Sequence, residues 1–164
     1  MLILVIGGFF FWQNEKQHDK KDRASLSEQS LKSEDEWREK LSSEEYKILR
    51  EAETEKPFSS PLNNETRRGT YVAVDTGKPL FRSEDKFDSG TGWPSFTRPI
   101  APDAVLERPD NSIFGERTEI LTTAGGHIGH VFTDGPAPTG LRYCMNGVAL
   151  RFIPDEEQSI GNKE

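Results

Sequence analysis

The sequence contains a single cysteine, Cys144, among its 164 residues, and this scarcity excludes several kinds of site. One thiol cannot form an intramolecular disulfide, and it cannot supply the ligands of a four-cysteine zinc site. Histidine is also scarce, since there are three and His18 lies in a polar segment. The other two, His127 and His130, are too few for a closed structural zinc site. A lone cysteine is then either a small buried hydrophobic residue or a reactive thiol.

Basic and apolar residues are in short supply as well. Lys and Arg number 21 against 28 Asp and Glu, which gives a net charge of −7 at pH 7. That sign argues against a nucleic-acid partner, because nucleic acids bind basic surfaces. Hydrophobic residues make up only 33% of the chain, yet 10 Phe, 3 Trp and 3 Tyr require burial. The composition therefore predicts one domain with a moderate core and a solvated tail.

A long apolar run is missing. The one candidate, residues 1–12, is uncharged but falls short of the roughly 20 apolar residues that a membrane-spanning helix needs. Its length suits the apolar region of a signal peptide, although no basic residue precedes it and no small-x-small cleavage site follows it. We expect an anchor or signal-like segment on an extracytoplasmic or membrane-anchored protein. The alternative is an apolar tail or docking strand on a cytoplasmic protein.

The remaining chain divides by composition into three parts. Residues 13–32 are polar, lack an apolar period and indicate a linker. Residues 33–154 carry the patterns of a folded domain, and residues 155–164 form an acidic tail.

Two short helices are predicted at the start of the domain. Ser33 and Glu36 form a capping box, and apolar residues follow at helical spacing. A second helix is expected to begin at Ser43 and to end at Pro57, because proline cannot continue a helix.

From Gly69 onward the pattern changes to short β segments. Residues 70–74 are rich in β-branched and aromatic side chains, which favour strands. Clusters of Gly and Pro separate the further strand candidates, which are residues 80–81, 113–114, 119–121, 128–132 and 141–153. Short strands divided in this way predict a mostly β domain built of antiparallel sheets.

The strand candidate that contains the cysteine has a polar face. Because alternate side chains on a strand share a face, Arg142, Cys144 and Asn146 are expected to point the same way. A guanidinium beside a thiol favours the nucleophilic thiolate. The alternative is a buried cysteine in a hairpin, since Asn146 followed by Gly147 is a strong hairpin-turn signal.

A glycine-rich stretch, residues 125–136, holds both remaining histidines. Histidine titrates near neutrality and can deliver a proton, and Asp134 could orient a histidine. Ordinary strand positions and a metal site are the alternatives for His127 and His130. With Cys144 in the same chain, general acid catalysis is at least as well supported as metal binding.

A third stretch places Trp93 in a loop of Gly and Pro residues. An indole ring held there could form the wall of a pocket for an apolar or soft group, because sulfur makes favourable contacts with aromatic rings. The alternative is a tryptophan that covers the edge of the core.

In this order, the three stretches resemble motifs of the methionine sulfoxide reductase B family. The resemblance covers residues 33–154 and implies the antiparallel β-sheet fold of that family with short N-terminal helices. It also implies reduction of the R epimer of protein-bound methionine sulfoxide to methionine. The segments that carry it are residues 37–41, 46–58, 87–96, 127–136 and 142–146.

The resemblance implies a catalytic role for several residues. Cys144 would attack the sulfoxide sulfur as a thiolate and would be left as a sulfenic acid when methionine departs. His130 is the expected acid for the departing oxygen, although the two histidines could exchange roles. His127 and Asn146 would place the sulfoxide oxygen or a water.

Four further residues complete the site that the resemblance implies. Trp93 would pack on the substrate methyl group, and Phe96 would be a second substrate-binding residue. Asp134 would orient the site, and Arg142 would hold its charges.

The chain departs from the family pattern at two places. Thr91 stands where many members have a resolving cysteine, so the sulfenic acid would need an external reductant: thioredoxin, a small thiol or a partner domain. Many members also hold a structural zinc on two Cys-x-x-Cys pairs, but residues 73–76 and 121–124 contain no cysteine. We therefore expect no zinc or other bound cofactor, and apolar packing in its place.

Two other functions compete with the reductase. The missing resolving cysteine would suit a non-catalytic module that binds peptides containing oxidised methionine. Cys144 with a histidine would also suit a different thiol enzyme, such as a peroxidase.

Overall fold

The computed structural model describes residues 32–112 and 115–156. The apolar run, nearly all of the linker, most of the acidic tail and the strand candidate at 113–114 therefore lie outside the described residues. The chain forms two compact units, residues 1–37 and 38–164, and helix α2 (Glu34–Lys40) spans their boundary. Over the described ranges, no helix is both long and apolar enough to cross a membrane.

Both predicted helices form, and each begins at a capping box. In the first unit, the Ser33 amide donates to the Glu36 side chain, while the Ser33 hydroxyl accepts from the Glu36 amide. In the second unit, helix α3 (Ser43–Glu51) has Ser42 as its N-cap. The buried side chains of α3 are Tyr46, Ile48 and Leu49.

Helix α3 ends earlier than predicted. Its last residue is Glu51, and Ala52 follows in the left-handed region with φ of 55°. The Ala52 amide then closes the end by donating to the Lys47 carbonyl. The prediction that Pro57 ends this helix is wrong, because a left-handed C-cap stops the helix first.

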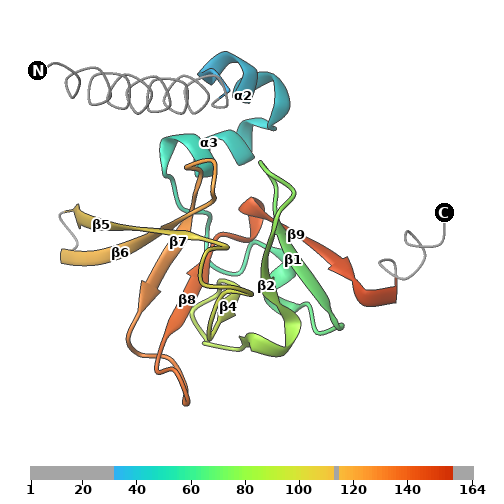
Figure 1. Cartoon of the computed structure of the whole chain (residues 1–164), viewed down its shortest axis with the longest axis vertical. Helices are drawn as coiled ribbons and strands as arrows, with labels where there is room; N and C mark the ends of the chain where they lie inside the picture. Colours follow the sequence, from blue (N-terminus) through green and yellow to red (C-terminus); the bar gives the residue numbers. More distant parts are fainter. Residues whose placement is uncertain (1–31, 113–114, 157–164) are drawn as a thin grey trace, which may run out of the picture. The chain divides into compact units, whose positions relative to one another are not determined.

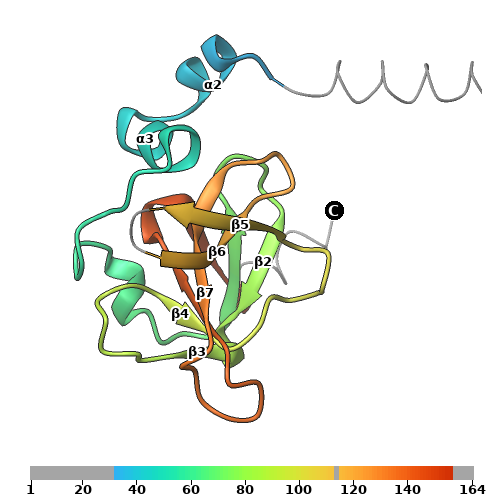
Figure 2. The ribbon, with the colours of Figure 1, turned by 90° about the vertical axis from the view of Figure 1, so that its left-hand side faces the viewer.

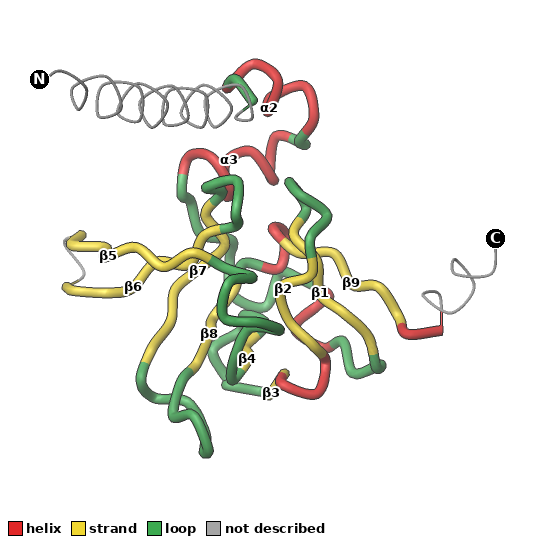
Figure 3. The backbone as a smooth tube through the Cα atoms, in the orientation of Figure 1, coloured by secondary structure: helices red, strands yellow, loops and turns green. Residues whose placement is uncertain are grey.

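In the part of the chain that the structure describes, nine strands form two antiparallel sheets, which confirms the predicted mostly β class (Figures 1 and 3). The three-stranded sheet has the order β2 (Pro79–Arg82), β1 (Gly69–Ala73), β9 (Leu150–Pro154). The six-stranded sheet has the order β3 (Lys86–Phe87), β4 (Ser95–Phe96), β8 (Arg142–Met145), β7 (His127–Phe132), β6 (Gly115–Leu121), β5 (Leu106–Ser112). In Figure 2, β5, β6 and β7 of the larger sheet face the viewer.

The described residues also contain three short 3₁₀ turns. The first, η1 (Pro61–Asn64), lies between α3 and β1, whereas η2 (Ser83–Asp85) and η3 (Gly147–Ala149) connect strands. The turn η3 corrects the hairpin expectation for Asn146 and Gly147. Asn146 is the N-cap of η3, which carries the chain from β8 in one sheet to β9 in the other. The candidate strand at 141–153 is therefore two strands in different sheets.

An aromatic cluster fills the space between the two sheets. Phe81 of β2 stacks on Phe96 of β4 with ring centroids 4.4 Å apart, and Tyr71 of β1 meets Phe96 edge-on at 4.9 Å. All three side chains are fully buried. Because burial of such rings dominates core stability, the cluster fixes how β4 and its neighbour β8 lie in the domain.

Candidate functional site

Strand pairing brings the cysteine and one histidine together. In the β7–β8 ladder, His130 lies directly opposite Cys144. Opposed residues of an antiparallel pair project to the same face, so this register places an imidazole beside the thiol. Both line a pocket of about 150 Å³. Its other lining residues are Thr54, Trp93, Arg117, Gly129, Phe132, Met145 and Asn146.

The thiol is half-buried and has a cation and hydroxyl groups for neighbours. The Thr91 hydroxyl oxygen lies 3.9 Å from Cys144 Sγ and 2.8 Å from the hydroxyl of Ser89. Arg142, two residues before the cysteine, interacts electrostatically with the sulfur. The side chain of Thr91 thus lies beside the thiol.

Arg142 is held in place from two sides. Its guanidinium donates twice to the Asp134 carboxylate, at 2.9 Å each, and lies 4.3 Å from the centre of the Phe132 ring. The hydrogen bond to Asp134 is the main reason that the pKa of Arg142 is raised, and the charge of Cys144 adds to this rise. Asp134 was expected to orient a histidine, but its partner in the structure is Arg142. Asp134 therefore positions the arginine.

His127 is buried behind the pocket. Its Nδ1 lies 2.8 Å from Glu119 Oε1, and its Nε2 lies 3.5 Å from Asn146 Nδ2. Burial lowers the pKa of His127, and the hydrogen bond with Glu119 only partly opposes this. An enclosed imidazole with a lowered pKa can position the Asn146 amide, whereas the pocket is lined by His130.

His130 has a carboxylate partner of its own. Its Nε2 lies 2.8 Å from Asp110 Oδ2, and the same oxygen receives the Arg117 guanidinium at 2.6 Å. The two imidazole centroids are 5.4 Å apart. Each histidine is thus oriented by an acid from the neighbouring hairpin of β5 and β6.

Sequence reasoning missed the acids Asp110 and Glu119. The available signal was the alternation in residues 117–121, which puts Arg117, Glu119 and Leu121 on one strand face. A carboxylate between β-branched and apolar neighbours is expensive to bury unless it has a partner. Glu119 is only 6% exposed and also pairs with Arg108.

A third missed residue, Glu55, connects two sides of the pocket. Its backbone carbonyl accepts from Trp93 Nε1 at 3.1 Å, and its amide donates to Asn146 Oδ1 at 3.0 Å. Its carboxylate accepts from the amides of Gly147 and Val148 in η3, at 2.8 and 2.9 Å. Burial raises the pKa of Glu55, while these two amide hydrogen bonds oppose the rise.

Phe96 is not part of the pocket. It was expected to bind substrate, but its ring is fully buried in the aromatic cluster. The physical reason is the alternation of β4, where Ser95 lies opposite Cys144 and Phe96 points into the core.

Among the described residues, no group of three or more His, Cys, Asp and Glu side chains is placed to hold a metal ion. A buried hydrogen bond joins residues 73–76 to residues 121–124, the two segments in which the resemblance led us to look for zinc ligands. Thr122 Oγ1 donates to Asp75 Oδ2 at 2.6 Å. Apolar packing was expected here; Ala73 and Leu121 are indeed buried, and this polar pair lies in addition to them.

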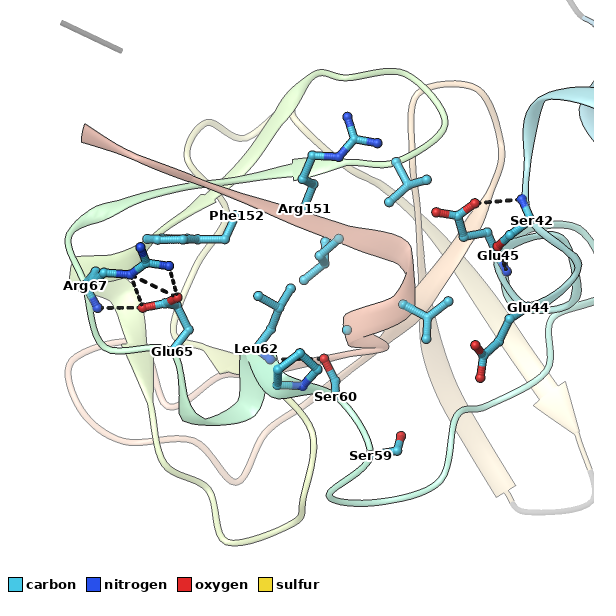
Figure 4. Close-up of a pocket in the computed structure, with 15 residues that line it drawn as sticks. Ser42, Glu44, Glu45, Ser59, Ser60, Leu62, Glu65, Arg67, Arg151 and Phe152 are labelled. Atoms are coloured by element: carbon cyan, nitrogen blue, oxygen red, sulfur yellow. Dashed lines mark hydrogen bonds and ion pairs between the residues drawn. The ribbon is translucent and has the colours of Figure 1, made fainter. Parts of the chain in front are cut away.

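A larger cavity of about 690 Å³ lies between the start of α3, η1 and β9 (Figure 4). At one end the Arg67 guanidinium pairs with Glu65, and at the other the Glu45 carboxylate accepts from the Ser42 amide. No thiol and no imidazole is among its lining residues. Thiol chemistry in this fold therefore belongs to the smaller pocket at Cys144.

Comparison with known proteins decides the family. Residues 41–154 match the model of the SelR domain. The chain belongs to the SelR family. It is 48% identical over 135 residues to peptide methionine sulfoxide reductase MsrB of Teredinibacter turnerae, covering 82% of this chain and 100% of that protein. The MsrB of Agrobacterium fabrum is 52% identical over 124 residues, which cover 75% of this chain and 92% of that protein.

A longer relative of this SelR-family chain also matches. Peptide methionine sulfoxide reductase MsrA/MsrB of Vibrio cholerae is 46% identical over 142 residues, covering 86% of this chain but 38% of that protein. The family resemblance that the sequence motifs indicated is thereby confirmed.

Proposed function

We propose that this chain is a peptide-methionine (R)-S-oxide reductase that uses Cys144 as its nucleophile. The observation that carries this proposal is the register of β7 and β8, which sets His130 opposite Cys144 in a pocket walled by Trp93. The names of the MsrB relatives support the same reaction class. The substrate is methionine sulfoxide in oxidised proteins.

The reaction transfers one oxygen from the substrate to the enzyme. The Cys144 thiolate attacks the sulfoxide sulfur, and His130 gives a proton to the sulfoxide oxygen as the sulfur–oxygen bond breaks. The released oxygen, as hydroxide or water, then bonds to the Cys144 sulfur as the newly formed sulfur–sulfur bond breaks. Methionine leaves, reduced by two electrons, and Cys144 remains as a sulfenic acid. We assign the proton to His130 because it lines the pocket, while the buried His127 holds Asn146.

Regeneration of the thiol requires two external thiol groups. Thr91 lies beside the sulfur, but a hydroxyl cannot form a disulfide. A first external thiol condenses with the sulfenic acid, releasing water and forming a mixed disulfide. A second thiol then displaces Cys144, so that the donor pair ends as a disulfide. A dithiol protein of the thioredoxin kind or a small dithiol fits this requirement.

We also propose an extracytoplasmic or membrane-anchored location. This proposal rests on the uncharged apolar composition of residues 1–12 alone.

The test of the reductase uses the full chain with separate R and S epimers of a blocked methionine sulfoxide, and dithiothreitol as the donor. The expected result is loss of the R epimer alone, with matching methionine, and no turnover in Cys144→Ser. Trapping with dimedone after one turnover without donor should label Cys144 as the sulfenic acid. Binding of oxidised peptides without turnover by any reductant would instead support the recognition module. Peroxide consumption faster than sulfoxide consumption would support a peroxidase.

A further inference from the structure

Phe58 is an exposed aromatic residue in a backbone conformation that disfavours it. Its side chain is 69% exposed, more than the other large hydrophobic residues that the structure describes as exposed. Its φ is 63°, in the left-handed region where a bulky residue is an outlier. The Ser59 amide donates to the Lys56 carbonyl, so Pro57 and Phe58 are the central residues of a turn whose third position favours Gly or Asn. Solvent exposure and a left-handed backbone are both unfavourable for an aromatic residue. Backbone outliers of this kind gather at functional sites.

The turn at Phe58 is hydrogen-bonded to the loop that carries Trp93. The Phe58 amide donates to the Gly92 carbonyl at 2.7 Å. A Cβ atom added to Gly92 would lie 2.8 Å from Phe58 Cδ2, so the ring lies against the Gly92 backbone. Gly92 stands between Thr91, which neighbours the thiol, and Trp93, which walls the pocket. Phe58 therefore borders the site.

The size of the pocket indicates what meets this ring. A volume of about 150 Å³ accommodates a single side chain, so a polypeptide substrate must pass over the rim on either side of its oxidised methionine. Thr54, four residues before Phe58 in the same segment, lines the pocket. Exposed aromatic rings at such rims provide contact area at low entropic cost.

We propose that Phe58 is a docking contact for the polypeptide that flanks the oxidised methionine. It favours substrates with an apolar residue near that methionine. This inference rests on the proposed reductase function. It predicts that Phe58 distinguishes peptide-bound methionine sulfoxide from the free blocked amino acid, which fills the pocket without touching the rim.

The test compares the wild type with Phe58→Asn, because asparagine accepts the left-handed backbone and removes only the ring. Ile100→Asn is the matched control, since Ile100 is 41% exposed and does not line the pocket. With dithiothreitol as donor, Phe58→Asn should lower kcat/KM for an R-sulfoxide peptide with apolar flanks by about tenfold, mainly through KM. Turnover of the free blocked R epimer should stay within about twofold, and Phe58→Tyr should restore peptide turnover.

Equal losses on both substrates would overturn the proposal, because Phe58 would then only support the Trp93 loop. Unchanged peptide turnover would also overturn it, as would a loss confined to assays in which thioredoxin replaces dithiothreitol. If the wild type reduces neither substrate, the proposed reductase function is wrong. Binding of the oxidised peptide then tests the docking contact separately. Fluorescence anisotropy of the oxidised peptide should then be weaker for Cys144→Ala/Phe58→Asn than for Cys144→Ala, and equal affinities would reject the docking contact.

Discussion

At the scale of single residues, the two histidines of the site have different surroundings although they lie three positions apart. His127 is enclosed and its pKa is lowered by burial, whereas His130 faces the pocket. The lowered pKa has a consequence for stability. Below the ordinary histidine value of 6.5, the unfolded chain gains a proton on His127 that the folded chain resists. The free energy of unfolding must then fall as the pH falls.

The substitution His127→Gln tests this linkage. The wild type should lose stability between about pH 6.5 and the lowered pKa of His127, whereas the variant should lack this part of the loss. The variant is expected to be less stable at neutral pH, because it loses the hydrogen bond to Glu119. Urea unfolding from about pH 8 to pH 5 measures both effects, and titrations common to the two proteins cancel in the difference. Parallel curves would contradict the role assigned to burial.

Glu55 does not line the pocket, but its loss should disturb the pocket because it contacts Trp93, Asn146 and η3. In Glu55→Ala, the amides of Gly147 and Val148 lose their acceptor, which should cost about 1–3 kcal/mol of stability. Without its carboxylate, residue 55 is no longer held by η3, and its backbone contacts with Trp93 and Asn146 should loosen. The kcat/KM for the R-sulfoxide should therefore fall as well.

Glu55→Gln keeps one acceptor oxygen and should retain part of both properties. Glu53→Ala, an exposed neighbour in the same loop, is the control and should match the wild type in urea unfolding and in R-sulfoxide turnover. If Glu55→Ala equals that control, the carboxylate does not anchor the pocket.

The part of the site that the sequence predicts is the part carried by local motifs. Cys144, His130, Asn146 and Trp93 were expected to share one site, and they line one pocket. The partners of His130 and Asn146, Asp110 and Glu55, were not predicted, because they come from other strands or loops, 20 and 91 residues away along the chain. Glu55 meets its backbone partners in η3 from more than 90 residues away. Such contacts follow from strand order, which local alternation does not determine.

At the scale of elements, the approach of β7 to β8 depends on one glycine. Gly129 has φ of 153°, and a Cβ atom there would lie 2.1 Å from the carbonyl oxygen of Cys144. A side chain would therefore force apart the ladder that aligns His130 with Cys144.

Gly129→Ala should destabilise the protein by about 1–3 kcal/mol or more and abolish most of its turnover. Gly125→Ala is the matched control at the start of the same stretch. Gly125 also has a positive φ, 79°, but a Cβ atom there would meet nothing within 4 Å. The control should lose about 1 kcal/mol through backbone strain and keep its kcat/KM. Thermal melts and R-sulfoxide assays compare the two, and similar losses would show that backbone strain, not the strand contact, matters.

Element boundaries were predicted where a side chain marks them. The predicted capping box at Ser33 indicates where the first helix begins, and the glycine-rich turns separate the strands. The end of α3 was misplaced because Ala52 adopts a left-handed cap that glycine usually marks. Asn146 was taken for a hairpin turn because its signal is local, whereas η3 connects two sheets.

At the scale of the whole molecule, the pocket and the apolar N-terminus belong to separate parts of the chain. Every lining residue of the pocket lies between Thr54 and Asn146, inside the unit of residues 38–164. The proposed anchor lies in residues 1–12. Catalysis and location should therefore be separable by truncation.

A chain that begins at Ser33 should keep kcat/KM for the blocked R-sulfoxide within about twofold of the full chain, since it retains every pocket residue. In fractionated cells, the full chain should accompany membranes or the extracytoplasmic fraction, and the truncated chain should not, because it lacks the uncharged run. Substituting Asp for Leu4 and Ile6 in the full chain provides a control that keeps the length and breaks only the apolar character. This control should follow the truncated chain. Equal distribution of all three forms would reject the proposed location, whereas lost turnover on truncation would place a catalytic contribution in the first unit.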